Sequence, residues 1–233
     1  DRAGSAFAMA DPSAYDWPAI LEGAAWLHLS GITPAVGPNA ADAALAAVAA
    51  ANRLGVKVSF DGNYRAQLWK NWGGDGPGVL KRLLDGAELA FINERDIALI
   101  LGAELKGADE TERRARAYEA AFKAFPRLKS MAATFRTQHG ADRHELSGVL
   151  ATRTASVTSR TYALDGIIDR IGAGDAFAAG VHFGLASEKG NQYTGDFAAA
   201  AAALKHSIAG DMNIESVPEI DGARAGGPPD VKR

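Results

Sequence analysis

Two glycines, a small residue between them and a carboxylate directly after them form the segment of this chain best equipped for chemistry. It reads Gly172-Ala173-Gly174-Asp175, and small and apolar residues follow it. Glycine permits close approach of a ligand, and the first turn of a helix offers unpaired N–H groups and a partial positive charge. A helix beginning at Asp175 would therefore form an anion site with a base beside it, as phosphoryl transfer to a hydroxyl requires.

The same four residues also fit a purely structural role. Glycine turns often precede helices, and aspartate is a favoured N-terminal cap. The segment is not a Gly-x-Gly-x-x-Gly dinucleotide motif, because Phe177 occupies the third glycine position. It is not a phosphate-binding loop ending in Gly-Lys-Ser/Thr either. On these residues alone, the capped turn and the anion site both stay open.

Composition indicates the class of protein. The chain has 233 residues, of which 47% are hydrophobic and 23% charged, and this predicts one globular α/β domain with a sizeable core. The net charge of −3 argues against a general affinity for nucleic acid or acidic membranes. Without cysteine there are no disulfides or thiolate metal sites. No apolar run has the length of a membrane span, and we expect a cytoplasmic protein.

Strands and helices alternate along the first part of the chain. Short apolar or β-branched runs predict strands, and apolar residues at helical spacing predict helices. The predicted strands are residues 26–30, 56–60, 89–92 and 131–135, and the predicted helices are residues 39–54, 79–84, 94–101 and 111–125. Strands joined through helices favour parallel pairing, so we expect a three-layer α/β/α fold with a mostly parallel central sheet.

The pattern changes after Gly140. Residues 147–157 and 160–168 are rich in Thr, Val and Ile, which predicts short strands in a hairpin or at a sheet edge. Two helices should follow, from Gly172 to about residue 187 and over residues 194–208. At the ends, we expect a strand and a loop in residues 1–9, and a frayed Gly/Pro-rich tail of residues 222–233 after a domain of residues 1–221.

Polar clusters follow three of the predicted strands. They are residues 61–65, residues 93–96 and residues 134–142. Ligands of open α/β sheets sit outside the carboxyl ends of the strands, so together these clusters predict a nucleotide and substrate cleft facing the glycine segment. Each cluster also has a structural explanation: Asp61 and Asn63 as turn formers, Asn93 as a helix cap, and Arg136 and Arg143 as solvated charges.

Other polar side chains favour structural roles. We expect His28 to be packed and hydrogen-bonded within its strand, and His139 and His144 to lie at the surface without a metal. The charged residues between 110 and 116 are typical of the solvated face of a helix.

Several of these segments resemble the ribokinase-like (PfkB) carbohydrate kinases. The run Asp169-x-x-Gly172-Ala173-Gly174-Asp175 is similar to the C-terminal signature of that family. Asn93-x-x-Asp96 resembles its Asn-x-x-Glu motif, with Asp in place of Glu. Residues 1–6, 61–69, 169–172 and 205–211 resemble more specifically the 2-keto-3-deoxygluconate kinases within the family.

The resemblance implies a role for each matching residue. Asp175 would be the general base for the sugar hydroxyl, and the amides of Gly172, Ala173 and Gly174 would stabilise charge on the transferring phosphoryl group. Arg2 and Arg65, with Asp175, would bind the sugar acid, because a bidentate guanidinium suits a carboxylate. The residues implied for the nucleotide are Asn63, Arg65, Arg136, Gly140, Gly172, Gly174, Lys205 and His206.

The resemblance also implies metal ions. Asn93, Glu94 and Asp96 would act on Mg²⁺ through water, although Asp96 is one methylene shorter than the family's Glu. A monovalent cation near Asp169 is a further expectation. The segment of residues 135–140 departs from the family, because it lacks the usual Lys-Gly-x-x-Gly.

The resemblance covers the C-terminal two thirds or so of such a kinase. We therefore expect the family's N-terminal strands, its Gly-Gly turn and its dimer-forming lid to be absent. This would leave an exposed sheet edge and half a sugar pocket, whereas the full-length protein would be a homo-oligomer.

The resemblance implies a kinase that transfers the ATP γ-phosphate to the terminal hydroxyl of 2-keto-3-deoxygluconate, giving the 6-phosphate. Its partners would be a small sugar acid and ATP, with neither nucleic acid nor a membrane. One alternative is a PfkB kinase for ribose, fructose or 2-keto-3-deoxygalactonate, and another is a nucleotide-binding module without catalysis. A Rossmann-type dehydrogenase is a third, which the missing Gly-x-Gly-x-x-Gly disfavours.

Overall fold

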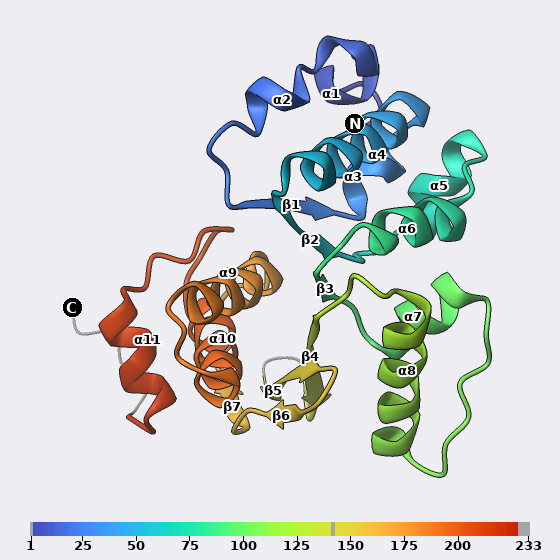
Figure 1. Ribbon diagram of the computed structural model, residues 1–233. Coiled ribbons are helices and arrows are strands. Elements are labelled where there is room, and N and C mark those ends of the chain that lie inside the picture. The colour runs from blue at the N-terminus through green and yellow to red at the C-terminus, as the bar shows by residue number, and fades with distance from the viewer. Residues whose placement is uncertain (1, 141–142, 228–233) are drawn as a thin grey trace. The chain divides into compact units, whose positions relative to one another are not determined.

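The computed structural model describes residues 2–140 and 143–227 (Figure 1). The chain divides into two compact units, Asp1–Met131 and Ala132–Arg233. Each unit is described separately below. The single domain expected over residues 1–221 stays a prediction.

The first unit contains a parallel sheet with strand order β1-β2-β3 (Figure 1). The strands are β1 (Trp26–Ser30), β2 (Lys57–Asp61) and β3 (Leu89–Phe91). The register places Ser30 beside Asp61 and Asp61 beside Phe91, so the three carboxyl ends meet at one edge. The predicted parallel pairing through helical crossovers is confirmed in this unit.

Helices connect these strands. The longer ones are α4 (Pro38–Leu54), α6 (Gly76–Asp85), α7 (Glu94–Leu101) and α8 (Glu110–Ala124). The shorter ones are α1 (Ala6–Met9), η1 (Pro12–Ala14), α2 (Trp17–Ile20), α3 (Ile32–Ala35) and α5 (Ala66–Trp72). Helix α4 buries a face of alanines and ends at Gly55, whose φ of 73° is the left-handed conformation that glycine adopts without strain.

Two expectations for the first unit need correction. Residues 6–9 form helix α1 and not a strand, because the Oγ of Ser5 accepts a hydrogen bond from the Ala8 amide and caps the helix. His28 does make the expected hydrogen bond, with 2.8 Å between its Nδ1 and the Ser59 Oγ. Its ring also lies edge-on against Phe91, with 5.8 Å between the centroids, but the residue is exposed and not enclosed in a core.

The second unit contains an antiparallel group of strands and three helices. Strand β4 (Ser130–Gln138) begins at the boundary between the units, and β5 (Arg143–Thr152) pairs with both β6 (Ser156–Thr158) and β7 (Tyr162–Asp165). The predicted hairpin is therefore confirmed. The helices are α9 (Ala173–Ala186), α10 (Asn191–Lys205) and α11 (Val217–Arg224).

Helices α9 and α10 lie side by side at a very short distance (Figure 1). A Cβ atom at Gly180 would lie 2.6 Å from the Ala198 Cα, and one at Gly184 would lie 2.5 Å from the Thr194 Oγ1. Ala198 and Thr194 of α10 face these two glycines, and the alanines at residues 198–202 are all buried. The alanine-rich helix α10 is therefore closely packed against α9.

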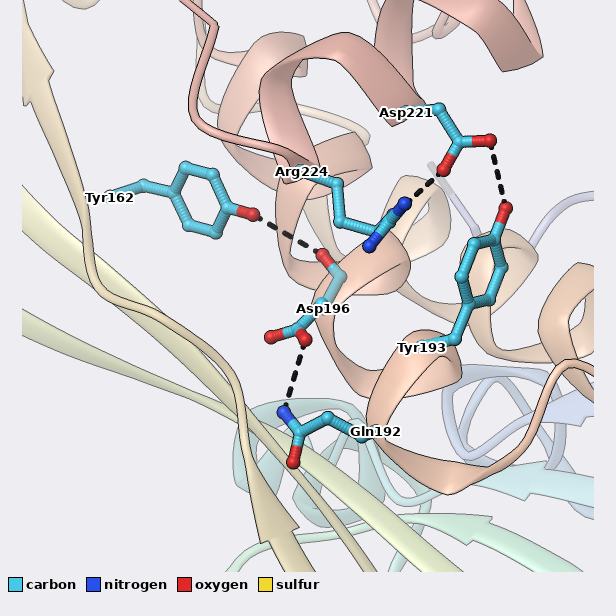
Figure 2. Close-up of polar contacts among 6 residues, drawn as sticks. All are labelled: Tyr162, Gln192, Tyr193, Asp196, Asp221 and Arg224. Carbon is cyan, nitrogen blue, oxygen red and sulfur yellow. Dashed lines mark hydrogen bonds and ion pairs between the residues drawn. The ribbon is translucent and has the colours of Figure 1, made fainter.

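Helix α11 is attached to α10 by a polar network (Figure 2). Asp221 accepts a hydrogen bond from the Tyr193 hydroxyl at 3.0 Å and another from the Arg224 Nε at 2.7 Å. The Arg224 guanidinium lies 4.6 Å from the centroid of the Tyr193 ring. Nearby, the Tyr162 hydroxyl donates to the backbone oxygen of Asp196, which links β7 to α10.

The C-terminal tail is shorter than expected. Residues 222–224 belong to helix α11 and not to a frayed tail, because Ser216 and Glu219 form a capping box that starts the helix. Residues 228–233 lie outside the described part of the chain. Across residues 2–140 and 143–227, no helix has the length and apolar character that crossing a membrane requires.

Candidate active site

The carboxyl ends of β1 and β2 bring polar groups together in the first unit. The Asn63 Nδ2 donates to the Ser30 Oγ at 3.1 Å, and the Asn63 amide donates to the Asp61 Oδ1 at 3.2 Å. The Gly31 amide also donates to the Asp61 carbonyl at 2.6 Å. These contacts fix Asn63 in an unusual conformation with a φ of 31°. Ser30 was not predicted as a site residue. Its hydroxyl at the end of a predicted strand, directly before a glycine, could have indicated one.

The next strand adds a capped helix to this edge. The Asn93 Oδ1 accepts from the amides of Arg95 and Asp96, and the Asp96 Oδ2 accepts from the Asn93 amide at 3.1 Å. This reciprocal pair is a capping box at the start of α7, the structural role that was the alternative for Asn93. Burial raises the pKa of Asp96, and the charge of Arg65 partly opposes this shift. Asp96 is therefore close enough to Arg65 for their charges to interact.

These residues do not form a direct cage for Mg²⁺. Within residues 2–140 and 143–227, no group of three or more His, Asp or Glu side chains could hold a metal ion. The side chains of Asn93 and Asp96 are occupied by the helix start. An action of Asn93, Glu94 and Asp96 on Mg²⁺ through water stays a prediction.

The two arginines expected to bind a sugar acid are both exposed. Arg65 precedes α5, and its Nη1 donates to the Tyr64 carbonyl at 3.3 Å. Arg2 lines a cavity of about 320 Å³ together with residues of α3 and α5, among them Ala35, Leu68 and Trp72. Arg65 is not in the lining of that cavity.

The glycine segment starts helix α9 in the second unit. Gly172 caps the helix with a φ of 79°, and a Cβ there would lie 1.9 Å from the Asp211 carbonyl oxygen. Gly174 faces open space, so its lack of a side chain has no steric explanation within the protein. The helix begins at Ala173, directly after the expected start at Gly172, and places Asp175 exposed in its first turn. The turn thus combines free amides with an accessible carboxylate.

Asp169 ties the glycine turn to the loop after α10. Its Oδ1 accepts from the Ile171 amide at 2.9 Å, and its Oδ2 accepts from the Gly210 amide at 3.0 Å. The hydrogen bonds from these two amides are the main reason that the pKa of Asp169 lies below its usual value.

Two residues at the end of α10 are buried. The His206 Nδ1 lies 2.7 Å from the Ala202 carbonyl, so Nδ1 carries the proton and Nε2 accepts from the Arg136 Nη2 at 2.9 Å. Burial lowers the pKa of His206. The Lys205 side chain is fully buried, and its Nζ donates to the Ile208 carbonyl at 2.9 Å. The structure therefore brings Arg136 and His206 together, while a direct contact of Lys205 with a nucleotide stays a prediction.

His144 corrects the expectation of a surface histidine. Only 1% of it is exposed, because the alternation of β5 places it on the same face as the buried Leu146. Its Nε2 lies 3.1 Å from the carbonyl oxygen of Gly140, and this contact holds the turn in which Gly140 was expected to meet the nucleotide. His139 is exposed as expected and lies 3.4 Å from Glu145. Asp142, the last residue of the third polar cluster, lies outside the described residues.

A larger cavity lies in the second unit next to His206. Its volume is about 510 Å³, and β7, the end of α10 and the residues around α11 line it. Both polar and apolar side chains face it, among them Arg160, Tyr162, Leu164, Ile167, His206 and Ser207.

Comparison with known proteins assigns the fold to a family. Residues 4–217 match the model of the pfkB family carbohydrate kinases. The chain belongs to this family. The mixed α/β architecture, with mostly parallel strands flanked by helices, is accordingly the ribokinase-like fold of the PfkB kinases.

Named relatives of this PfkB-family chain are sugar-acid kinases. It is 28% identical to the 2-dehydro-3-deoxygalactonokinase of Haloferax volcanii, over 100% of this chain and 67% of that protein. It is 34% identical to the crystal structure of a 2-dehydro-3-deoxygluconokinase from Thermotoga maritima, with a TM-score of 0.86 over 95% of this chain and 66% of that one. The chain thus spans about two thirds of the length of these relatives.

A more distant neighbour supports the fold alone. It is an uncharacterized sugar kinase from Pyrococcus horikoshii in complex with ATP, 20% identical, with a TM-score of 0.61 over 87% of this chain and 58% of that one.

Proposed function

We propose that this chain contributes the phosphoryl-transfer centre of an ATP-dependent kinase for a 2-keto-3-deoxy sugar acid, with 2-keto-3-deoxygluconate as substrate and the 6-phosphate as product. The observation that carries the proposal is the turn at the start of α9. There Gly172 is packed against Asp211, Gly174 is open to solvent, and Asp175 is exposed one residue later. Family membership and the names of the relatives support the same reaction class.

Each residue of the turn Gly172-Ala173-Gly174-Asp175 has a defined task in this proposal. The terminal hydroxyl of the sugar forms a bond to the γ-phosphorus, the bond from that phosphorus to ADP breaks, and Asp175 takes the hydroxyl proton. The amides of Gly172, Ala173 and Gly174 stabilise the charge on the transferring group, because they belong to the unpaired first turn of a helix. A loose transition state lets Asp175 orient the hydroxyl first and accept its proton late.

The remaining assignments concern binding. Arg2 and Arg65 would hold the substrate carboxylate. Mg²⁺, when it accompanies ATP, would neutralise phosphate charge, and Glu94 and Asp96 would orient its water ligands with Asn93. The residues assigned to the nucleotide are Asn63, Arg65, Arg136, Gly140, Lys205 and His206, in addition to the glycine turn.

A coupled ADP-release assay tests the proposal. The longest natural polypeptide that carries this sequence is supplied with ATP, Mg²⁺ and one acceptor at a time: 2-keto-3-deoxygluconate, 2-keto-3-deoxygalactonate, ribose or fructose. We expect turnover with the keto-deoxy sugar acids and a preference for the gluconate epimer. Turnover with ribose or fructose only would contradict the substrate class, and no turnover with any sugar would contradict the reaction.

Nucleotide binding without catalysis is the second candidate for the 233-residue chain by itself. It is favoured by the observation that the chain spans 67% of the Haloferax volcanii kinase and 66% of the Thermotoga maritima one. Equilibrium dialysis with ATP, run beside the ADP-release assay, separates the two. Saturable ATP binding without turnover supports this candidate, and turnover by the 233-residue chain eliminates it.

A further inference from the structure

A monovalent cation near Asp169 is the one expected ion whose surroundings the structure shows in detail. Such an ion needs several free oxygen ligands. Both carboxylate oxygens of Asp169 already accept hydrogen bonds, from the Ile171 and Gly210 amides. The carbonyl of His206, on the same loop, accepts from the amides of Ile168 and Asp169 at 2.9 and 3.3 Å. The oxygens around Asp169 are therefore engaged by donors of the chain.

Lys205 brings a positive charge of the protein itself into the surroundings of Asp169. Lys205 has an exposure of 0%, and its ammonium donates to the Ile208 carbonyl at 2.9 Å. The positive charge of Lys205 also contributes to the lowered pKa of Asp169. A buried ammonium without compensation is very costly, and the hydrogen bond to the Ile208 carbonyl supplies part of that compensation. A free monovalent cation entering here would meet a like charge. The residues present therefore do not fit the expected ion.

We propose that the ammonium of Lys205 takes the place of a monovalent cation in the second unit. It supplies a positive charge near Asp169, and it binds a carbonyl of the loop of residues 206–211. Unlike a dissolved ion, it is tethered to α10 and cannot leave. The structure of this loop is then independent of the concentration of potassium or sodium.

The consequence reaches the glycine turn through one contact. The Asp211 carbonyl lies where a side chain of Gly172 would be, three residues after the carbonyl that Lys205 holds. Asp169 holds the same loop through the Gly210 amide. Lys205 is thus a positioning residue for the turn at the start of α9. Only this last consequence rests on the proposed function, because the ion replacement concerns the fold.

The first experiment uses the unmodified 233-residue chain. Its Tm is measured in potassium, sodium and tetramethylammonium chloride at equal ionic strength, since tetramethylammonium is too large for an ion site. We expect the same Tm in all three salts. A saturable rise in Tm that is selective for potassium or sodium would overturn the proposal.

The second experiment uses Lys205→Met, which keeps the length of the side chain and removes the charge. We expect its Tm to fall by several degrees and to recover in part in potassium or sodium chloride but not in tetramethylammonium chloride, because the oxygens of Asp169 and Ile208 lose their cation. Lys81→Met, at an exposed position of α6, is the matched control and should leave the Tm unchanged. A Lys205→Met chain as stable as the unmodified one would refute the proposal.

These measurements need neither ATP nor sugar. Failure of the kinase assay therefore leaves the proposal about Lys205 standing, and an ion-selective Tm leaves the kinase proposal standing. If Lys205→Met does not fold, the Tm of the unmodified chain in the three salts still tests the proposal about Lys205.

Discussion

Asp175 lies exposed in the first turn of α9, where its carboxylate is accessible while the backbone around it is fixed by the helix. Replacement by asparagine keeps the shape of the side chain and removes its ability to take a proton. We expect Asp175→Asn to lower turnover by about 10²- to 10⁴-fold in the active polypeptide, the usual contribution of a general base. ATP affinity, measured by equilibrium dialysis, should change by no more than a few-fold. Near-normal turnover would show that the base is another residue.

Gly172 and Gly174 form a matched pair of glycines. Gly172→Ala places a Cβ 1.9 Å from the Asp211 oxygen at a φ of 79°, so we expect the free energy of unfolding to fall by about 1–3 kcal/mol or more in urea titrations. Gly174→Ala adds its methyl group to open space within a helix, so stability should be kept or rise slightly.

The same methyl group at residue 174 would occupy the approach of a phosphate. We therefore expect Gly174→Ala to weaken ATP binding without a loss of stability. Unchanged ATP affinity in this stable variant would argue for the capped turn as a purely structural feature.

At the scale of elements, β4 and α10 are coupled through a histidine whose neutral form the fold requires. The pKa of His206 is lowered from 6.5, first by burial, while Arg136 on β4, His144 on β5 and Lys205 add positive charge around it. The unfolded chain therefore binds more protons than the folded chain just below pH 6.5. The free energy of unfolding should fall as the pH drops below this value, and the stabilisation should be fully present above it.

Urea titrations across this pH range test the coupling. His206→Gln, whose amide oxygen can still accept from Arg136, should show a weaker dependence on pH than the unmodified chain. His139→Gln changes an exposed histidine and serves as the control. If the pH dependence is the same in all three chains, His206 is not its source.

Helix α11 depends on the Tyr193–Asp221–Arg224 network (Figure 2). Tyr193→Phe removes one hydrogen bond of 3.0 Å and keeps the ring that stacks on Phe197 and Arg224. We expect a loss of about 1 kcal/mol in the free energy of unfolding, and faster amide hydrogen exchange in residues 217–224 than elsewhere in the unit. Exchange that quickens equally in α9 would mean that the network supports the whole unit and not α11 in particular.

The elements themselves were largely predictable from the sequence. The strand at residues 89–92 and the helix at residues 94–101 each follow from a local pattern, and the structure confirms them. The strand and loop predicted for residues 1–9 were wrong over residues 6–9, which form a helix. The composition of so short a segment favours neither structure, and the cap by Ser5 decides for the helix. The burial of His144 and Lys205 could not be read from the sequence, since it depends on contacts with residues distant in the chain.

For the whole molecule, the distribution of tryptophan offers a direct probe. All four tryptophans, at residues 17, 26, 69 and 72, belong to the first unit. Each unit has its own buried core, so a change confined to the second unit should act mainly on that unit. In Gly172→Ala we expect a larger shift of the unfolding midpoint by circular dichroism than by tryptophan fluorescence. Equal shifts by both methods would mean that the units unfold as one.

At this scale the candidate site was only partly predictable. Parallel pairing was enough to bring residues 61–65 and 93–96 to one edge, as the structure confirms. The signature of residues 169–175 was enough to predict the turn at α9. Which of these groups meet a substrate depends on contacts that no local pattern encodes.

The contact between α9 and α10 has a mechanical consequence. A Cβ atom at Gly180 would meet the Ala198 backbone and one at Gly184 would meet Thr194, so at these two positions the helices are too close for a side chain of α9 to lie between them. A sliding or rolling motion of α9 against α10 would cause steric clashes at these two positions. We therefore expect the amides at the start of α9 to be displaced only when the packed pair of helices α9 and α10 is displaced. A ligand that binds these amides must adapt to α9, because α9 has no room to adapt to the ligand.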